Sequence, residues 1–278
     1  MKRKTDGLDS CCHGKEHSTG SAEHENKSGN EGTVSKTILF LAAAAFIIMI
    51  FNQIQLLSVS SAAGQPVATG VATVYAEVIP KGVPAIYGKE LGVSFDDVSI
   101  NDAQRADNTI KKLGNLDNTL TLTGSNLERY VAIASQISCE YCCGAKSIIF
   151  TKEDEERIEK QIQAAIASGK ITAVQADQYR QKAGGAACGC AHSFAMRGLG
   201  KYLILNHGDE FSDDEILGEM AKWKTLFFPT QMTAKAGVMK EKGMDFSYAK
   251  LGSNEFRGLE SQATSGNSGS SGGMVGGC

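Results

Sequence analysis

The longest apolar run of the chain lies near its amino terminus, where it begins at Ile38 and continues, with a few polar interruptions, to Val59. As an α-helix, this run would be about 33 Å long at ~1.5 Å per residue, close to the ~30 Å hydrocarbon core of a bilayer. We therefore predict a single N-terminal transmembrane helix over residues 37–59 that contacts the lipid bilayer. A cleaved signal peptide is the alternative, since small residues follow at 61–63.

Charges beside this run predict its orientation. Six Lys and Arg residues precede it, whereas the next one after it is Lys81. Because positively charged flanking residues favour the cytoplasmic side of a membrane, we expect a cytoplasmic amino terminus. The C-terminal domain would then lie outside the cytoplasm, in a single-pass protein of the cell membrane.

Beyond residue 100, apolar residues recur mostly at helical spacing. Ile158, Ile162 and Ile166 form one such stripe, and residues 102–113 and 192–208 also have helical patterns. Four Ser or Thr residues stand three positions before Glu, Asp or Gln, the spacing of a capping box at a helix start. These pairs are Ser125 and Glu128, Thr151 and Asp154, Thr172 and Gln175, and Ser212 and Glu215. Short strands are predicted only at 119–123 and 147–150.

Composition divides the chain into five parts. Residues 1–36 are polar and predict a disordered cytoplasmic tail, followed by the transmembrane anchor at 37–59. Residues 60–100, rich in Ala, Gly, Val and Ser, predict an extended stalk. A cysteine-rich helical domain at 101–240 precedes a flexible Gly/Ser-rich tail at 241–278. The predicted fold class is mainly α: a single transmembrane helix, then a small helical domain with two cysteine-bearing loops and little β.

The charge balance narrows the range of partners. A formal net charge of -3 shows no basic excess, so we expect no nucleic acid partner. The sequence contains neither a phosphate-binding Gly-rich loop nor a Gly-x-Ser-x-Gly motif. No protein partner is identified by these patterns.

Five of the eight cysteines form two clusters, Cys139-x-x-Cys142-Cys143 and Cys188-x-Cys190-x-His192. Two short loops that each present a pair of sulfur ligands can close a tetrahedral site around Zn²⁺ or another thiophilic ion.

We predict Cys139, Cys142, Cys188 and Cys190 as the four thiolate ligands, with Cys143 and His192 as substitutes or extra ligands. A zinc ion is the expected cofactor, and copper(I) or an iron-sulfur cluster are the alternatives. One disulfide between the clusters, with the other thiols left over, is a competing interpretation that would make this a disulfide-stabilised interaction domain.

An enzymatic alternative is thiol-disulfide exchange through Cys139 and Cys142. Redox pairs of this kind usually sit at a helix amino terminus, which lowers the pKa of the attacking thiol. Here the pattern places the end of a helix before Cys139, so that stabilisation of the thiolate is not expected. We assign no catalytic residue and favour a metal-binding protein over an enzyme.

The two clusters also carry a resemblance. The segments CEYCCGAK at 139–146, ACGCAHS at 187–193 and MRGL at 196–199 resemble uncharacterised, membrane-anchored, cysteine-rich proteins of archaeal type. This resemblance spans roughly residues 75–235 and implies the topology and a cysteine site, but no activity. A fainter likeness, from the second cluster through Ser212, is to the membrane-tethered thiol oxidoreductases of cytochrome c maturation. Those proteins carry Cys-x-x-Cys where this chain has Cys188-Gly189-Cys190.

Overall fold

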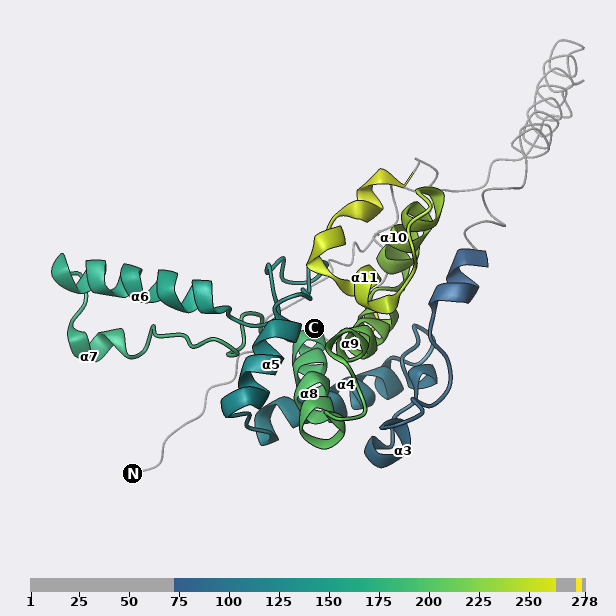
Figure 1. Cartoon of the computed structure of the whole chain (residues 1–278), viewed down its shortest axis with the longest axis horizontal. Coiled ribbons are helices and arrows are strands. Elements are labelled where there is room, and N and C mark those ends of the chain that lie inside the picture. The colour runs from purple at the N-terminus through teal and green to yellow at the C-terminus, as the bar shows by residue number, and fades with distance from the viewer. Residues whose placement is uncertain (1–72, 264–273, 277–278) are drawn as a thin grey trace, which may run out of the picture. The chain divides into compact units, whose positions relative to one another are not determined.

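The computed structural model describes residues 73–263 and 274–276, in which the regular secondary structure is helical (Figure 1). The helices of eight or more residues are α4 (Ala103–Thr119), α5 (Gly124–Ala134), α6 (Lys152–Ala167), α8 (Ala191–His207), α9 (Asp213–Phe227) and α10 (Pro229–Glu241). Shorter ones are α3 (Gly88–Leu91), α7 (Ala173–Ala176), α11 (Tyr248–Gly252) and the 3₁₀ turns η1 (Phe95–Asp97), η2 (Asn254–Phe256) and η3 (Leu259–Gln262). In these residues, β structure is limited to three isolated bridges.

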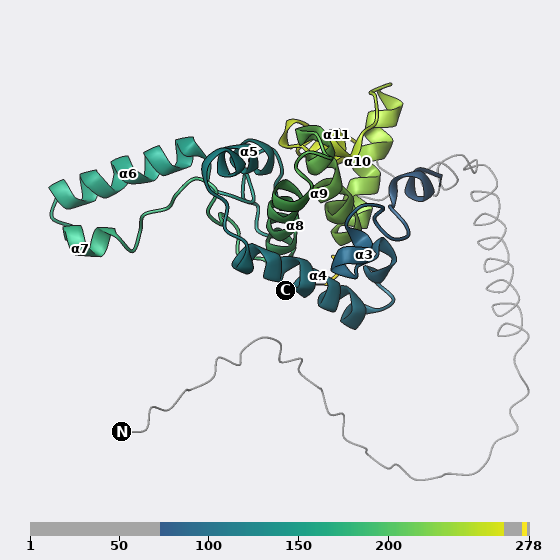
Figure 2. The same cartoon turned by 60° about the horizontal axis from the view of Figure 1, so that its bottom comes forward.

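Helix α8 lies at the centre of the fold and packs against α4, α5 and α9. Figure 2 shows α4 lying across it. Glycines allow the close approach of these two helices. A Cβ on Gly198 of α8 would lie 2.1 Å from the Leu113 carbonyl oxygen and 2.9 Å from the Asp117 nitrogen, both in α4. The backbones therefore touch at Gly198, and the apolar faces of both helices are buried around this contact.

We expect Gly198→Ala to destabilise the fold by about 1–3 kcal/mol, the usual cost of overpacking a core, because α4 and α8 must move apart. Gly237→Ala in α10 is the matched control, since a Cβ there meets nothing within 4 Å. That control should be neutral or stabilising by up to about 1 kcal/mol. Denaturant midpoints measured at constant m-value compare the two variants. Equal midpoints would contradict the role given to Gly198.

Helix starts confirm three of the four predicted capping boxes. Thr151, Thr172 and Ser212 each accept a hydrogen bond from the backbone N–H three residues on. The side-chain oxygen of that third residue accepts one in turn from the backbone N–H of the N-cap. The fourth prediction is wrong, because α5 begins at Gly124 after Thr123 and its N-cap makes no side-chain hydrogen bond.

Neither predicted strand forms. Helix α4 continues to Thr119, into the first of the two segments. In the second segment Ile149 makes only an isolated bridge with Ala186. At 119–123, alternation of apolar and polar residues is not sufficient for a strand, because a strand also needs a partner to pair with. At 147–150, the pairing is too short to form one.

The fold class requires a correction with respect to the membrane. Within residues 73–263 and 274–276, no helix combines the length and apolar character needed to cross a bilayer. Helices α4 and α8 have 17 residues each, fewer than the ~20 predominantly apolar residues that a span requires. The predicted span at 37–59, its lipid contact and the tail at 1–36 lie outside the described residues.

Two predicted domain boundaries are also wrong. Tyr87 and Phe95, in the predicted stalk, are buried against Trp223 of α9. The Trp223 indole N–H donates to the Tyr87 hydroxyl at 2.9 Å, so these aromatic side chains join the segment to the domain core. Beyond residue 240, α11 packs on α9, and Leu251 and Leu259 are buried. The helical domain therefore includes residues that were assigned to the stalk and the tail.

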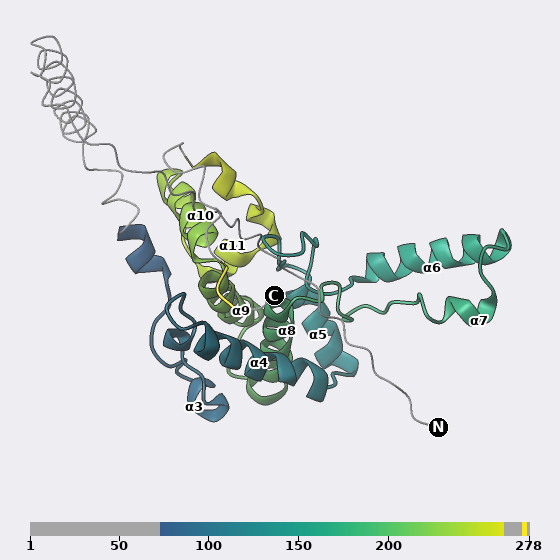
Figure 3. The ribbon, with the colours of Figure 1, turned by 180° about the vertical axis from the view of Figure 1, so that it is seen from behind.

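One part of the fold projects from the rest. Helices α6 and α7, with the segments that join them to the body, form what we call the α6–α7 arm (Figures 1 and 3). Ile162 is the one residue of α6 that is fully buried. Because the arm lies between the two cysteine clusters in the sequence, both ends of the arm reach the cysteine site.

Candidate metal centre

Backbone pairing at the base of the α6–α7 arm brings the two cysteine loops together. The Phe150 N–H donates to the Gly185 carbonyl at 2.8 Å, and the Gly184 N–H donates to the Phe150 carbonyl at 2.9 Å. The Ala187 N–H completes the set with a 3.2 Å bond to the Ile148 carbonyl. The chain thus leaves the first loop, runs through the arm and returns beside its starting point.

Arg197 of α8 holds the base of the α6–α7 arm in place from the side of the core. Its side chain is 1% exposed, and its Nη1 donates to the carbonyl oxygens of Cys188 at 2.8 Å and Ile148 at 3.2 Å. Its Nε donates to Asp117 of α4 at 2.8 Å. The charge of this buried guanidinium is therefore paired, and its hydrogen bonds connect both loops to the α4–α8 packing.

A disulfide joins the two clusters. It links Cys143 to Cys188, with Cα atoms 6.5 Å apart, which is the cross-cluster pairing that competed with a purely metal-based interpretation. Cys188, predicted as one of four principal thiolate ligands, is therefore bonded to Cys143 instead. Cys139, Cys142 and Cys190 lie outside the disulfide.

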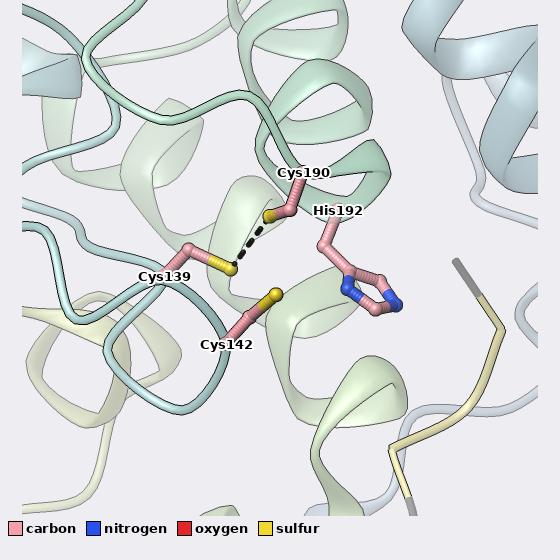
Figure 4. Close-up of side chains that lie close together, drawn as sticks. All are labelled: Cys139, Cys142, Cys190 and His192. Carbon is pink, nitrogen blue, oxygen red and sulfur yellow. Dashed lines mark hydrogen bonds between the residues drawn. The ribbon is translucent and has the colours of Figure 1, made fainter. Parts of the chain in front are cut away.

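These three cysteines and His192 converge on one point (Figure 4). Their candidate ligand atoms all lie within 4.8 Å of one another, and the sulfurs of Cys139 and Cys190 are 3.2 Å apart. Cys139 and Cys142 come from the loop after α5, whereas Cys190 is the N-cap of α8 and His192 lies in its first turn. Four soft or borderline donors at this spacing can hold a metal ion.

His192 is oriented as metal-binding histidines usually are. Its side chain is buried, with ring centroids 4.7 Å from Phe227 and 5.1 Å from Phe228. The Nε2 atom lies 2.9 Å from the Val275 carbonyl oxygen. Because a carbonyl only accepts, Nε2 carries the proton and Nδ1 presents its lone pair.

The Nδ1 atom of His192 is buried and has no nitrogen or oxygen partner among the residues that the structure describes, and the His192 side chain interacts with Cys190. Figure 4 shows one ring nitrogen of His192 on the side of the sulfurs. A buried acceptor without a donor is costly, by about 1–3 kcal/mol. An ion among the sulfurs would satisfy it.

The surroundings of Cys190 favour a thiolate. The thiol of Cys139, hydrogen-bonded to Cys190, lowers the pKa of Cys190, and this same hydrogen bond together with burial raises the pKa of Cys139. The pair therefore holds one proton on Cys139. The Ser193 backbone N–H also lies 3.4 Å from the Cys190 sulfur, at the amino terminus of α8, where the helix dipole favours negative charge.

A buried ion cluster lies beside the sulfurs. Glu140, between the first two cysteines, accepts from Lys224 of α9 at 3.1 Å and from Lys235 of α10 at 2.9 Å. Both lysine side chains are 0% exposed. Burial would raise the pKa of Glu140, but the two lysine charges outweigh it and lower that pKa. Burial lowers the pKa of Lys224 to about 8, although the negative charge of Glu140 raises it and offsets part of this effect. Lys224 is therefore mostly protonated at neutral pH.

These two lysines were not among the predicted site residues, although the sequence carries a signal for them. Lys224 follows Met220 by four residues and precedes Phe227 by three, so it falls on the apolar stripe of α9 rather than opposite it. Lys235 follows Met232 by three residues and precedes Met239 by four, so it falls on the apolar stripe of α10 in the same way. A charged residue on an apolar stripe predicts a buried charge with a partner.

The geometry bears on the thiol-exchange alternative as well. Helix α5 ends at Ala134, before Cys139, so Cys139 and Cys142 lack the helix amino terminus typical of redox pairs. It is Cys190 that occupies such a position.

Comparisons with protein-family models, with curated proteins and with solved structures found no match. Both resemblances stated from the cysteine motifs therefore remain predictions. The assignment of a site rests on its own geometry: a cysteine and histidine cluster that can hold a metal ion.

Proposed function

We propose that this protein binds one thiophilic metal ion, a zinc ion, through Cys139, Cys142, Cys190 and His192. The observation that carries the proposal is the buried Nδ1 of His192, which faces three sulfurs and has no nitrogen or oxygen partner among the described residues. Its second nitrogen donates to a backbone carbonyl, the usual arrangement behind a metal-binding histidine.

Charge supports a divalent ion over copper(I). Three thiolates and a neutral imidazole around a divalent ion carry a net charge of about -1. The adjacent cluster contains three positive and two negative groups, a net charge of +1 when all are ionised: Lys224, Lys235, Arg257, Glu140 and Glu260. The two charges offset each other in a region of low dielectric constant, whereas a monovalent ion would leave one more buried negative charge.

The ion would have a structural role. Four protein ligands fill a tetrahedral zinc site, which leaves no position for a substrate. The ligands come from the loop after α5 and from the amino terminus of α8, so the ion joins two segments far apart in the sequence. In addition, such a site is coupled to folding, because metal binding stabilises only the state in which the ligands are assembled.

Elemental analysis of the full chain, purified anaerobically without added metal, tests the proposal. We expect close to one zinc per chain, with the thiols of Cys139, Cys142 and Cys190 protected from alkylation until a chelator is added. Copper or iron at the same stoichiometry would overturn the choice of zinc.

No metal, with all three thiols alkylated at once, would overturn metal binding altogether. Thiol-disulfide exchange would then be the better account, because Cys190 Sγ lies 3.5 Å from Cys188 Sγ of the disulfide.

A further inference from the structure

All five clustered sulfurs belong to one contiguous group, and two ligand sets overlap in it. The first set is Cys139, Cys142, Cys190 and His192, and the second is Cys139, Cys143, Cys188 and Cys190. In each set the ligand atoms lie within 4.8 Å of one another. Cys139 and Cys190 are common to both, with their sulfurs 3.2 Å apart.

The redox state of Cys143 and Cys188 determines which set is complete. While these two cysteines form the disulfide, the second set has only two thiols, and the first set is the one with four donors. When the disulfide is reduced, the second set offers four thiolates. Cys188 Sγ already lies 3.5 Å from Cys190 Sγ, so an ion held by the shared pair has a new ligand close by.

We propose that the Cys143–Cys188 disulfide is a redox switch that moves the bound ion from a site with three sulfurs and one nitrogen to a site with four sulfurs. This inference rests on the proposed function, since it requires an ion in the first site. Reduction makes the coordination more sulfur-rich, which favours softer, more thiophilic ions.

A small dithiol or a dithiol protein is the reductant that fits the geometry. Cys143 is exposed, whereas Cys188 is buried at 4% exposure, so attack takes place at the Cys143 sulfur. One thiolate of the dithiol bonds to Cys143 Sγ, the Cys143–Cys188 bond breaks, and its electron pair leaves on Cys188 Sγ. The second thiolate of the dithiol then attacks the first dithiol sulfur, and Cys143 leaves as a thiolate. Two electrons have passed to the protein, and the dithiol has become a disulfide.

Transfer of the ion follows without further electron exchange. Bonds to Cys142 Sγ and His192 Nδ1 break, and bonds to Cys143 Sγ and Cys188 Sγ form, while Cys139 and Cys190 stay bound. The site gains one negative charge, because a neutral imidazole and one thiolate are replaced by two thiolates. Lys224 and Lys235 lie beside the site and lower the cost of that charge.

X-ray absorption of the zinc-loaded full chain tests the switch, before and after treatment with a phosphine that does not supply sulfur ligands. The phosphine reduces the disulfide and becomes a phosphine oxide with oxygen from water. We expect about three sulfur neighbours at ~2.3 Å and one nitrogen at ~2.0 Å before treatment, and four sulfurs after it. An unchanged set of neighbours, in protein whose thiol count shows full reduction, would overturn the switch and leave the proposed function intact. Protein without zinc in either state would overturn the proposed function itself.

Two variants provide a crossed control. Cys142→Ser removes a partly exposed ligand of the first set only. Until the phosphine is added, the zinc affinity of this variant should be at least about tenfold below that of the wild type. Even the loss of groups outside the coordination sphere lowers metal affinity roughly 10–100-fold. Cys143→Ser combined with Cys188→Ser removes the second set, so its affinity should not respond to the phosphine. If both variants responded alike, the disulfide would not select the ligands.

Discussion

Cys139→Ala is expected to abolish stoichiometric metal binding in both redox states of the protein. Cys139 is one of two residues common to the two ligand sets, so no complete set remains after the substitution. With free metal at about 1,000 times its Kd, binding to the folded state alone contributes about 4 kcal/mol. At about 2–4 °C of Tm per kcal/mol for a domain of 150–250 residues, the Tm should fall by roughly 8–16 °C.

Thermal unfolding with and without a chelator separates loss of the ion from loss of packing. Chelator should lower the Tm of the wild type toward that of Cys139→Ala, and should leave the variant unchanged. Cys11→Ser is the matched control, because Cys11 belongs to neither cluster; its metal content and Tm should follow the wild type. A Cys139→Ala protein that retained one ion per chain would contradict the ligand assignment.

Glu140→Gln is expected to destabilise the domain by about 3–5 kcal/mol, the usual cost of removing one partner from a buried ion pair. Glu140 is 6% exposed and lies between Lys224 and Lys235, both 0% exposed. Gln keeps the shape and an acceptor oxygen but not the charge. The two buried ammonium groups would then lie near each other without the carboxylate that holds them together. Arg257, 3.6 Å from Glu140, is exposed, and the remaining acid is Glu260, 3.8 Å from Lys235.

Denaturant unfolding at pH 7 measures this effect, and the same substitution at Glu159 is the control. Glu159 pairs with Arg180 at 3.1 Å, but both side chains are about 40% exposed, so water replaces most of the lost interaction. Glu140→Gln should also retain its metal, because the added positive charge favours thiolates. Equal unfolding midpoints for the two variants would show that the buried cluster does not contribute to stability.

The starts of α6, α7 and α9 could be predicted from sequence because their signals are local. At Thr151, Thr172 and Ser212 the capping hydrogen bonds join residues three apart, so the chain needs no distant partner to form them. Likewise, the two cysteine clusters are evident from spacing, since neighbouring cysteines share one short loop.

The boundaries of the domain could not be predicted in the same way. Tyr87 and Phe95 lie in a segment with no clear period, and they are part of the core only because Trp223 of α9 offers a surface for them. The segment that contains α11 is similar, because its buried residues pack on a helix that precedes it in the chain. Burial of this kind depends on contacts across long sequence separations, for which composition carries no signal.

For the site itself, the amino-acid sequence was enough to identify the residues, as two loops with five cysteines and a histidine that can hold a metal ion. Only the tertiary structure decided which of these side chains pair and which face one another. Pairing of Cys143 with Cys188 depends on the base of the α6–α7 arm and on Arg197, and the orientation of His192 depends on the carbonyl of Val275. The physical reason is that spacing limits which atoms can share a loop, whereas ligand choice depends on which distant groups fold against that loop.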